Sequence, residues 1–118
     1  EKMEICLYYR VKQAGIRVNF TVNIARDDGV YCFGTSALSG ASDRSGISVK
    51  DAGMVSMMIT ANHLLKGRYL VDIEIQDMQE RPIDRIQNAM EFWVENEKHG
   101  QRGIVYLPVS WKLNEQRL

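Results

Sequence analysis

The chain has 118 residues, and its fifteen Lys and Arg balance fifteen Asp and Glu, so the formal net charge is zero. A neutral surface cannot gather the phosphate contacts that nucleic acids need, and it gives no attraction to anionic lipid. Apolar residues make up 45% of the chain, enough for a packed core. No apolar run reaches the roughly 20 residues of a membrane helix.

The length predicts one domain over residues 1–118. Because residue 1 is Glu and a strand pattern starts almost at once, we expect this domain to be a fragment of a longer chain.

Alternation of apolar and polar residues along the first third of the chain predicts two β-strands and a hairpin. From Met3 to Val11 every second residue is apolar, and residues 18–24 repeat the pattern. Asp28-Gly29 is a strong hairpin signal, since both tight-turn positions tolerate positive φ, and residues 30–35 are the expected partner strand.

The remainder of the chain predicts further strands joined by polar turns. Residues 36–53, rich in Ser, Gly and Asp, are expected to form the longest loop. We expect strands at 54–60, 69–75, 90–94 and 105–111, and one short helical turn at 82–87. The expected core consists of the inward-pointing residues Phe20, Val22, Ile24, Tyr69, Val71, Ile73, Phe92, Val94 and Trp111.

These elements amount to about seven strands at even spacing. That pattern indicates an all-β fold, an antiparallel two-sheet β-sandwich of the jelly-roll or immunoglobulin-like kind.

The motifs of enzymes and metal sites are missing from the sequence. No phosphate loop, dinucleotide-binding glycine motif or nucleophile elbow occurs, and His63 and His99 lack the spaced partners of a zinc site. Two cysteines, Cys6 and Cys32, are expected to be reduced thiols, because a cytosolic domain of this size needs no disulfide. We therefore expect no enzymatic activity, no metal and no cofactor.

Outward-pointing aromatic residues are the strongest candidates for a binding role. They can stack on the apolar faces of sugar rings, while amide and charged neighbours bind the hydroxyl groups. The glycan-binding candidates chosen by this parity are Tyr8, Arg10, Asn19, Asn23, Trp93 and Tyr106. An alternative for Trp93 is an anchor in a dimer interface, where tryptophan is also enriched.

Five segments, together covering most of the chain in a fixed order, are similar to a known family. They are Ile24-Ala25-Arg26-Asp27-Asp28-Gly29, Gly34-Thr35, Leu65-Lys66-Gly67-Arg68-Tyr69, Ala89-Met90-Glu91-Phe92-Trp93-Val94, and Gly103 to Leu107 followed by Trp111. The chain resembles the C-terminal domain of the ATP-binding subunit of bacterial polysaccharide ABC transporters, the Wzt-type O-antigen exporters.

The resemblance implies a jelly-roll-like sandwich, often dimeric, that binds the exported O-antigen glycan without catalysis. It also implies an ATPase domain upstream, a transporter membrane subunit reached through the full-length protein, and a cytoplasmic location at the inner face of the membrane. The alternative is a structural module that forms a homodimer by pairing or exchange of edge strands and binds no sugar.

Overall fold

The computed structural model describes residues 2–12, 15–39, 44–95, 100–114, 116 and 117. Its strands are, in chain order, β1 (Met3–Arg10), β2 (Ile16–Arg26), β3 (Tyr31–Ser36), β4 (Ile47–Val49), β5 (Ala52–Ile59), β6 (Gly67–Gln76), β7 (Pro82–Val94), β8 (Lys112–Leu113) and β9 (Gln116–Arg117). The described residues contain no helix, which confirms the all-β prediction, and none of them forms a segment able to cross a membrane as a helix.

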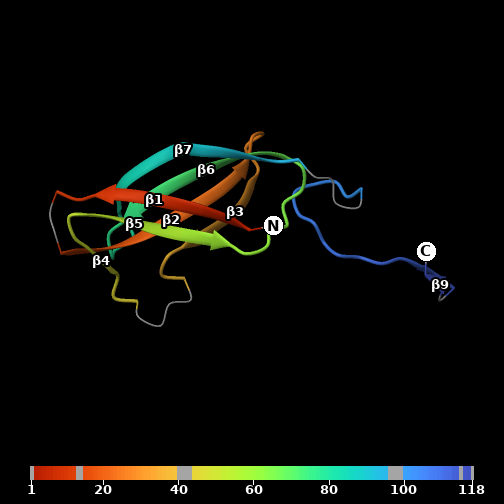
Figure 1. Ribbon diagram of the computed structural model, residues 1–118, viewed down its shortest axis with the longest axis horizontal. Helices are drawn as coiled ribbons and strands as arrows, with labels where there is room; N and C mark the ends of the chain where they lie inside the picture. Colours follow the sequence, from red (N-terminus) through yellow and green to blue (C-terminus); the bar gives the residue numbers. More distant parts are fainter. Residues whose placement is uncertain (1, 13–14, 40–43, 96–99, 115, 118) are drawn as a thin grey trace.

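Two antiparallel sheets face each other (Figure 1). The large sheet has the strand order β3-β2-β6-β7, and β4 pairs with the first residues of β2. The small sheet consists of β1 and β5, paired from Met3–Ile59 to Arg10–Ala52. The expected β-sandwich is therefore confirmed.

The Asp28-Gly29 hairpin forms as expected. Gly29 has a φ of 90°, which suits glycine, and the chain reverses from β2 into β3 with a hydrogen bond from the Arg26 amide to the Val30 carbonyl. The Arg26 guanidinium hydrogen-bonds the Asp28 carboxylate and holds the pKa of that carboxyl below its usual range.

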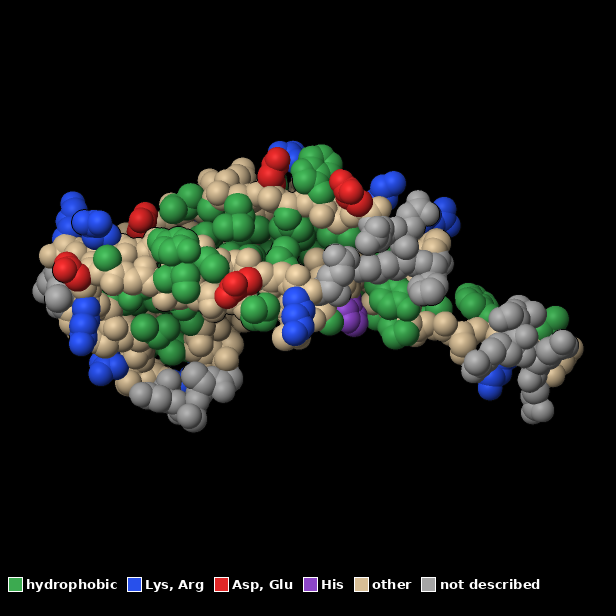
Figure 2. Space-filling view, viewed as in Figure 1, with side chains coloured by type: hydrophobic (Ala, Val, Ile, Leu, Met, Phe, Trp, Pro, Cys, Tyr) green, Lys and Arg blue, Asp and Glu red, His purple; other side chains and the backbone are tan. Residues whose placement is uncertain are grey.

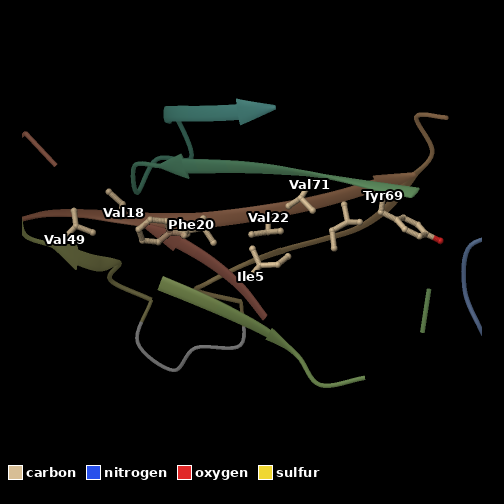
Figure 3. Close-up of a cluster of buried hydrophobic side chains, with 9 residues drawn as sticks. Ile5, Val18, Phe20, Val22, Val49, Tyr69 and Val71 are labelled. Carbon is tan, nitrogen blue, oxygen red and sulfur yellow. The ribbon is translucent and has the colours of Figure 1, made fainter. Parts of the chain in front are cut away.

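The core lies between the two sheets, where the apolar sets of β1, β2 and β6 meet (Figure 3). Its buried members are Ile5, Leu7, Val18, Phe20, Val22, Ile24, Val49, Tyr69 and Val71. Period-2 alternation places these side chains on one face of each strand, so packing the sheets together removes them from water at once. Ile73, Phe92 and Val94 pack against this cluster while half-buried, as the predicted inward parity requires.

Tyr69 closes one end of the core. Its ring is fully buried and stacks on Phe92 with 5.3 Å between ring centroids. Its hydroxyl donates a hydrogen bond of 2.6 Å to the Leu65 carbonyl, so the buried hydroxyl group of Tyr69 has a partner. Burial raises the pKa of the Tyr69 hydroxyl, so it remains a donor at neutral pH.

The region 36–53 is shorter as a loop than expected. Residues 47–49 form β4 on the edge of β2, and β5 already begins at Ala52. Residues 40–43 of the predicted loop lie outside the described residues. Pairing with strands distant in sequence therefore orders a segment whose composition alone is typical of a loop.

The short helical turn predicted at 82–87 is wrong, because these residues are the first half of β7 and pair with β6. The apolar spacing of Ile83 and Ile86 is not that of a regular strand, and the structure gives the reason. The register between β6 and β7 shifts twice, and Asn88 at one irregularity has a φ of 51°. A bulge adds a residue to the strand and so breaks the alternation of apolar and polar residues from which strands are predicted.

The last strand, predicted at 105–111 with Trp111 in the core, is also wrong. Only Val105 makes a bridge, to Leu64, and the chain beyond Leu107 leaves the sandwich (Figure 1). Trp111 has 73% of its surface exposed and lies outside the core. The alternation in this segment is real, but its described pairing is a single bridge of Val105 to Leu64 beside the backbone hydrogen bond from Tyr106 to His63, which does not make it a strand of a sheet.

Candidate functional site

The six glycan-binding candidates do not share one surface. Asn19, Asn23 and Trp93 belong to the outer face of the large sheet, because their strand neighbours Val18, Phe20 and Phe92 point into the sandwich. Tyr8 and Arg10 belong to the outer face of the small sheet, on the opposite side of the molecule. Tyr106 lies in the C-terminal segment, so the structure brings only part of the set together.

An exposed indole dominates one end of the large sheet's outer face. Trp93 pairs with Arg68 across β6 and β7 and has 61% of its surface exposed. The Arg68 guanidinium lies 5.8 Å from the centroid of the indole, within the range of a cation–π interaction. Arg68 is itself held by Glu91, with a 2.9 Å hydrogen bond from Nε to Oε2. This arrangement fixes the orientation of the indole while most of its surface faces water.

Polar groups continue from the indole toward the middle of the sheet. Asn23 on β2 pairs directly with Asp72 on β6, one strand spacing apart. The Asp72 carboxylate accepts a 2.7 Å hydrogen bond from the backbone N–H of Asn88 in the β7 bulge, so the bulge holds the Asp72 side chain in place. The Asn23 amide oxygen accepts a 3.0 Å hydrogen bond from the Tyr31 hydroxyl on β3. A donor-bearing amide and an acceptor carboxylate thus lie side by side.

Tyr31 is a residue that the sequence reading missed. It pairs with Ala25 on the same outward face and has 65% of its surface exposed. The signal that could have found it is the hairpin: after Asp28-Gly29, the register of β3 against β2 places Tyr31 on the outward side. Arg68 and Asp72, also outward by parity, complete the face.

We call this surface the polar–aromatic face, made of Asn23, Tyr31, Arg68, Asp72, Glu91 and Trp93. Its two aromatic residues stand on β3 and β7, separated by three strand spacings, or about 14 Å. It is an open surface on the outside of a sheet, the kind of surface that an extended ligand can lie across.

Gly34 makes room for the hydroxyl of Tyr31. A Cβ at position 34 would lie 1.9 Å from the Tyr31 hydroxyl and 2.4 Å from the Asn23 amide oxygen. We therefore predict that Gly34→Ala displaces the Tyr31 ring from Asn23 and rearranges this end of the polar–aromatic face. Because the obstructing atoms are the ends of mobile side chains, the melting temperature should change little. Titration of the variant with a glycan, followed by tryptophan fluorescence, should show weaker binding than wild type. An unchanged affinity would show that Tyr31 takes no part in glycan binding.

The outer face of the small sheet has a different character. Tyr8 is 80% exposed, but its cross-strand partner is Met54, and Met58 is exposed further along the same strand. Arg10 lies at the end of β1 and borders a groove between β1 and β7. Thioethers accept hydrogen bonds poorly, and the polar groups of this face are Glu4, Ser56 and Arg10.

Two further candidates have structural contacts of their own. The amide oxygen of Asn19 accepts a hydrogen bond from the Leu38 amide and so fixes the chain that leaves β3. Tyr106 is half-buried, with its ring edge-on to His63 and its backbone amide bonded to the His63 carbonyl. Asn19 lies four positions along β2 from Asn23, opposite Gln76, and Tyr106 is half-buried, so both are weaker candidates than Asn23 and Trp93.

No group of His, Cys, Asp or Glu in the described part of the chain is arranged to hold a metal ion. His63 belongs to the C-terminal contact just described, and His99 lies outside the described residues. Cys6 and Cys32 are free thiols on different sheets.

The comparisons with known proteins agree with this fold. The family model of the Wzt C-terminal domain matches residues 1–107, so the chain belongs to the Wzt C-terminal domain family. A solved structure described as the crystal structure of the C-terminal domain of wzt superposes with a TM-score of 0.79 at 19% sequence identity, covering 96% of this chain and 70% of that chain. No match was found among curated proteins.

Membership in this family connects the chain with polysaccharide ABC transport. Within such a transporter the Wzt C-terminal domain is a non-catalytic domain, and the ATPase is a different domain.

Proposed function

We propose that the polar–aromatic face binds the polysaccharide that the transporter exports, an O-antigen glycan of the bacterial surface. The observation that carries the proposal is the exposed Trp93 indole, oriented by Arg68 on the same sheet face as the Asn23–Asp72 pair. In the full-length protein, this domain would couple the glycan to the ATPase and the membrane subunit at the cytoplasmic face of the inner membrane. Residues 1–118 would act there as one β-sandwich domain.

The chemistry of the face suits a sugar polymer. Sugar rings present apolar C–H groups that stack on an aromatic ring, and each hydroxyl needs a donor or an acceptor. The Asp72 and Glu91 carboxylates accept hydrogen bonds, whereas the Asn23 amide and the Arg68 guanidinium donate them. Stacking and hydrogen bonding can therefore act together along one sugar chain.

The function is tested by probing the purified chain with an array of bacterial surface polysaccharides, followed by calorimetry with each polysaccharide retained. We expect retention of at least one polysaccharide, with heat that saturates at a defined sugar concentration. No retained glycan and no heat at millimolar sugar would overturn the proposal.

A second role, formation of a homodimer, is favoured by the C-terminal arm, which we define as residues 108–113. The arm extends away from the sandwich, whose overall extents with the arm reach 65 × 30 × 22 Å (Figure 1). Its apolar residues alternate, and Val109, Trp111 and Leu113 are each more than 60% exposed. Among the described residues, Lys112–Leu113 (β8) pairs only with the short β9 that follows it, so these exposed apolar side chains gain stability when other protein surface covers them.

The sandwich has an apolar region that such an arm could cover. Between β1 and β7 lies a groove of about 450 Å³, floored by Phe20 and Ile75 and bordered by Tyr9 and Ile83. Ile83 and Ile86 on β7 are about half-exposed, and hydrophobic side chains form a band across the front of the molecule in Figure 2. We propose that the arm of a second copy lies along this groove, so that two chains exchange arms.

Light scattering tests the exchange with two matched variants, Trp111→Ala and Trp93→Ala. Because Trp111 would be buried at the interface, its truncation should weaken the dimer by about 2 kcal/mol or more, whereas Trp93→Ala should leave the mass unchanged. Dissociation by Trp93→Ala alone would instead place Trp93 in the interface. A wild-type chain that remains a monomer at high micromolar concentration would refute the exchange.

A further inference from the structure

The charges of the polar–aromatic face restrict the class of glycan that it can take. The face carries one guanidinium, Arg68, and two carboxylates, Asp72 and Glu91, which leaves one negative charge in excess. Arg68 is already paired with Glu91. Asp72 accepts a backbone amide, and no Arg or Lys among the described residues forms an ion pair with it.

The neighbouring part of the sheet does not change this balance. Further along β6 and β7, Arg85 lies 3.9 Å from Glu74 and is thereby partnered. At the far end of β2, the guanidinium of Arg17 donates hydrogen bonds to Ser45 and to the Gly46 carbonyl. Each guanidinium on this outer face therefore already has an acceptor within its own chain.

An acidic polymer on this face would meet two costs. Its carboxylate or phosphate groups would lose water and find each guanidinium of the face already paired, and burying an unpaired charge is expensive. They would also lie close to Asp72 and Glu91, and like charges across an interface oppose binding. A neutral sugar meets neither cost, because its hydroxyls donate hydrogen bonds to the same carboxylates, and charged acceptors form the stronger bonds.

Resting on the proposed glycan-binding function, we infer that the ligand of this chain is an uncharged polysaccharide, without uronic acid, sialic acid or phosphate in the units that contact the polar–aromatic face. The two carboxylates select hydroxyl-bearing sugars and exclude anionic ones. The specificity thus follows from Asp72 and Glu91, while stacking on Trp93 is common to both ligand classes.

The test uses an array with equal numbers of neutral and acidic bacterial polysaccharides, probed with the wild-type chain and with Trp93→Ala. We expect retention of neutral polysaccharides only, lost in Trp93→Ala. Raising NaCl from about 50 to about 500 mM should change the dissociation constant less than twofold, since no counterions are released.

The outcomes separate the inference from the function on which it rests. Acidic polysaccharides retained by wild type and lost in Trp93→Ala would overturn the inference and leave the glycan-binding face in place. If wild type and Trp93→Ala retain glycans equally, the binding site lies away from Trp93. That result would overturn both the inference and the proposed function of the polar–aromatic face. An array without any retained glycan would also overturn both.

Discussion

Trp93→Ala is expected to weaken glycan binding by about 1–3 kcal/mol, by analogy with the stacking of nucleic-acid bases on aromatic side chains. That loss corresponds to roughly a 5- to 150-fold increase in the dissociation constant. The reason is geometric: the indole is 61% exposed and lies within cation–π distance of Arg68, so its ring is open to a sugar. Calorimetry with a polysaccharide that wild type retains would measure the change.

Tyr8→Ala is the matched control, because Tyr8 is an aromatic residue of comparable exposure on the opposite side of the sandwich. We expect this variant to bind like wild type. If Tyr8→Ala weakens binding and Trp93→Ala does not, the glycan lies on the small sheet, beside Met54 and Arg10. If neither variant matters, Tyr106 and the region 36–53 are the next places to examine.

Phe20→Ala should lower the free energy of unfolding by about 3–5 kcal/mol, the usual cost of removing a buried aromatic ring. Phe20 is 3% exposed, lies in the centre of the core cluster, and contacts Tyr9 with 5.6 Å between ring centroids. Since domains are typically stable by about 5–15 kcal/mol, this loss is a large fraction of the total. Denaturant titration followed by circular dichroism measures it.

Phe33→Ala is the control for that measurement. Phe33 is 45% exposed at the edge strand β3, so its truncation should cost much less than that of Phe20. Equal losses for the two variants, or a loss below about 1 kcal/mol for Phe20→Ala, would contradict the burial described above.

The sequence determined the β-rich character, the hairpin and most of the core, because these depend on local patterns. Alternation assigns each residue to one side of its own strand, and for Phe20, Tyr69 and Val71 the inward side is buried. The same parity placed Tyr8 and Trp93 outward, and both are exposed. Asp28-Gly29 needed only its own backbone preferences to predict the turn.

Only the tertiary structure decided which outward residues lie together. Parity separates inside from outside on each strand, but a sandwich has two outer faces, and pairing between distant strands determines which strands share one. The β3-β2-β6-β7 order therefore unites Tyr31, Asn23, Asp72 and Trp93 and leaves Tyr8 and Arg10 on the other side.

Tertiary pairing also decided the two segments where the sequence reading failed. Residues 82–87 became strand because β6 offered an edge to pair with, and a bulge absorbed the irregular apolar spacing. The segment 105–111 has a strand's alternation, yet burial requires an opposing surface, and the described residues leave 73% of the Trp111 surface exposed. Periodicity is a local property of the sequence, whereas burial depends on which other surface comes into contact with it.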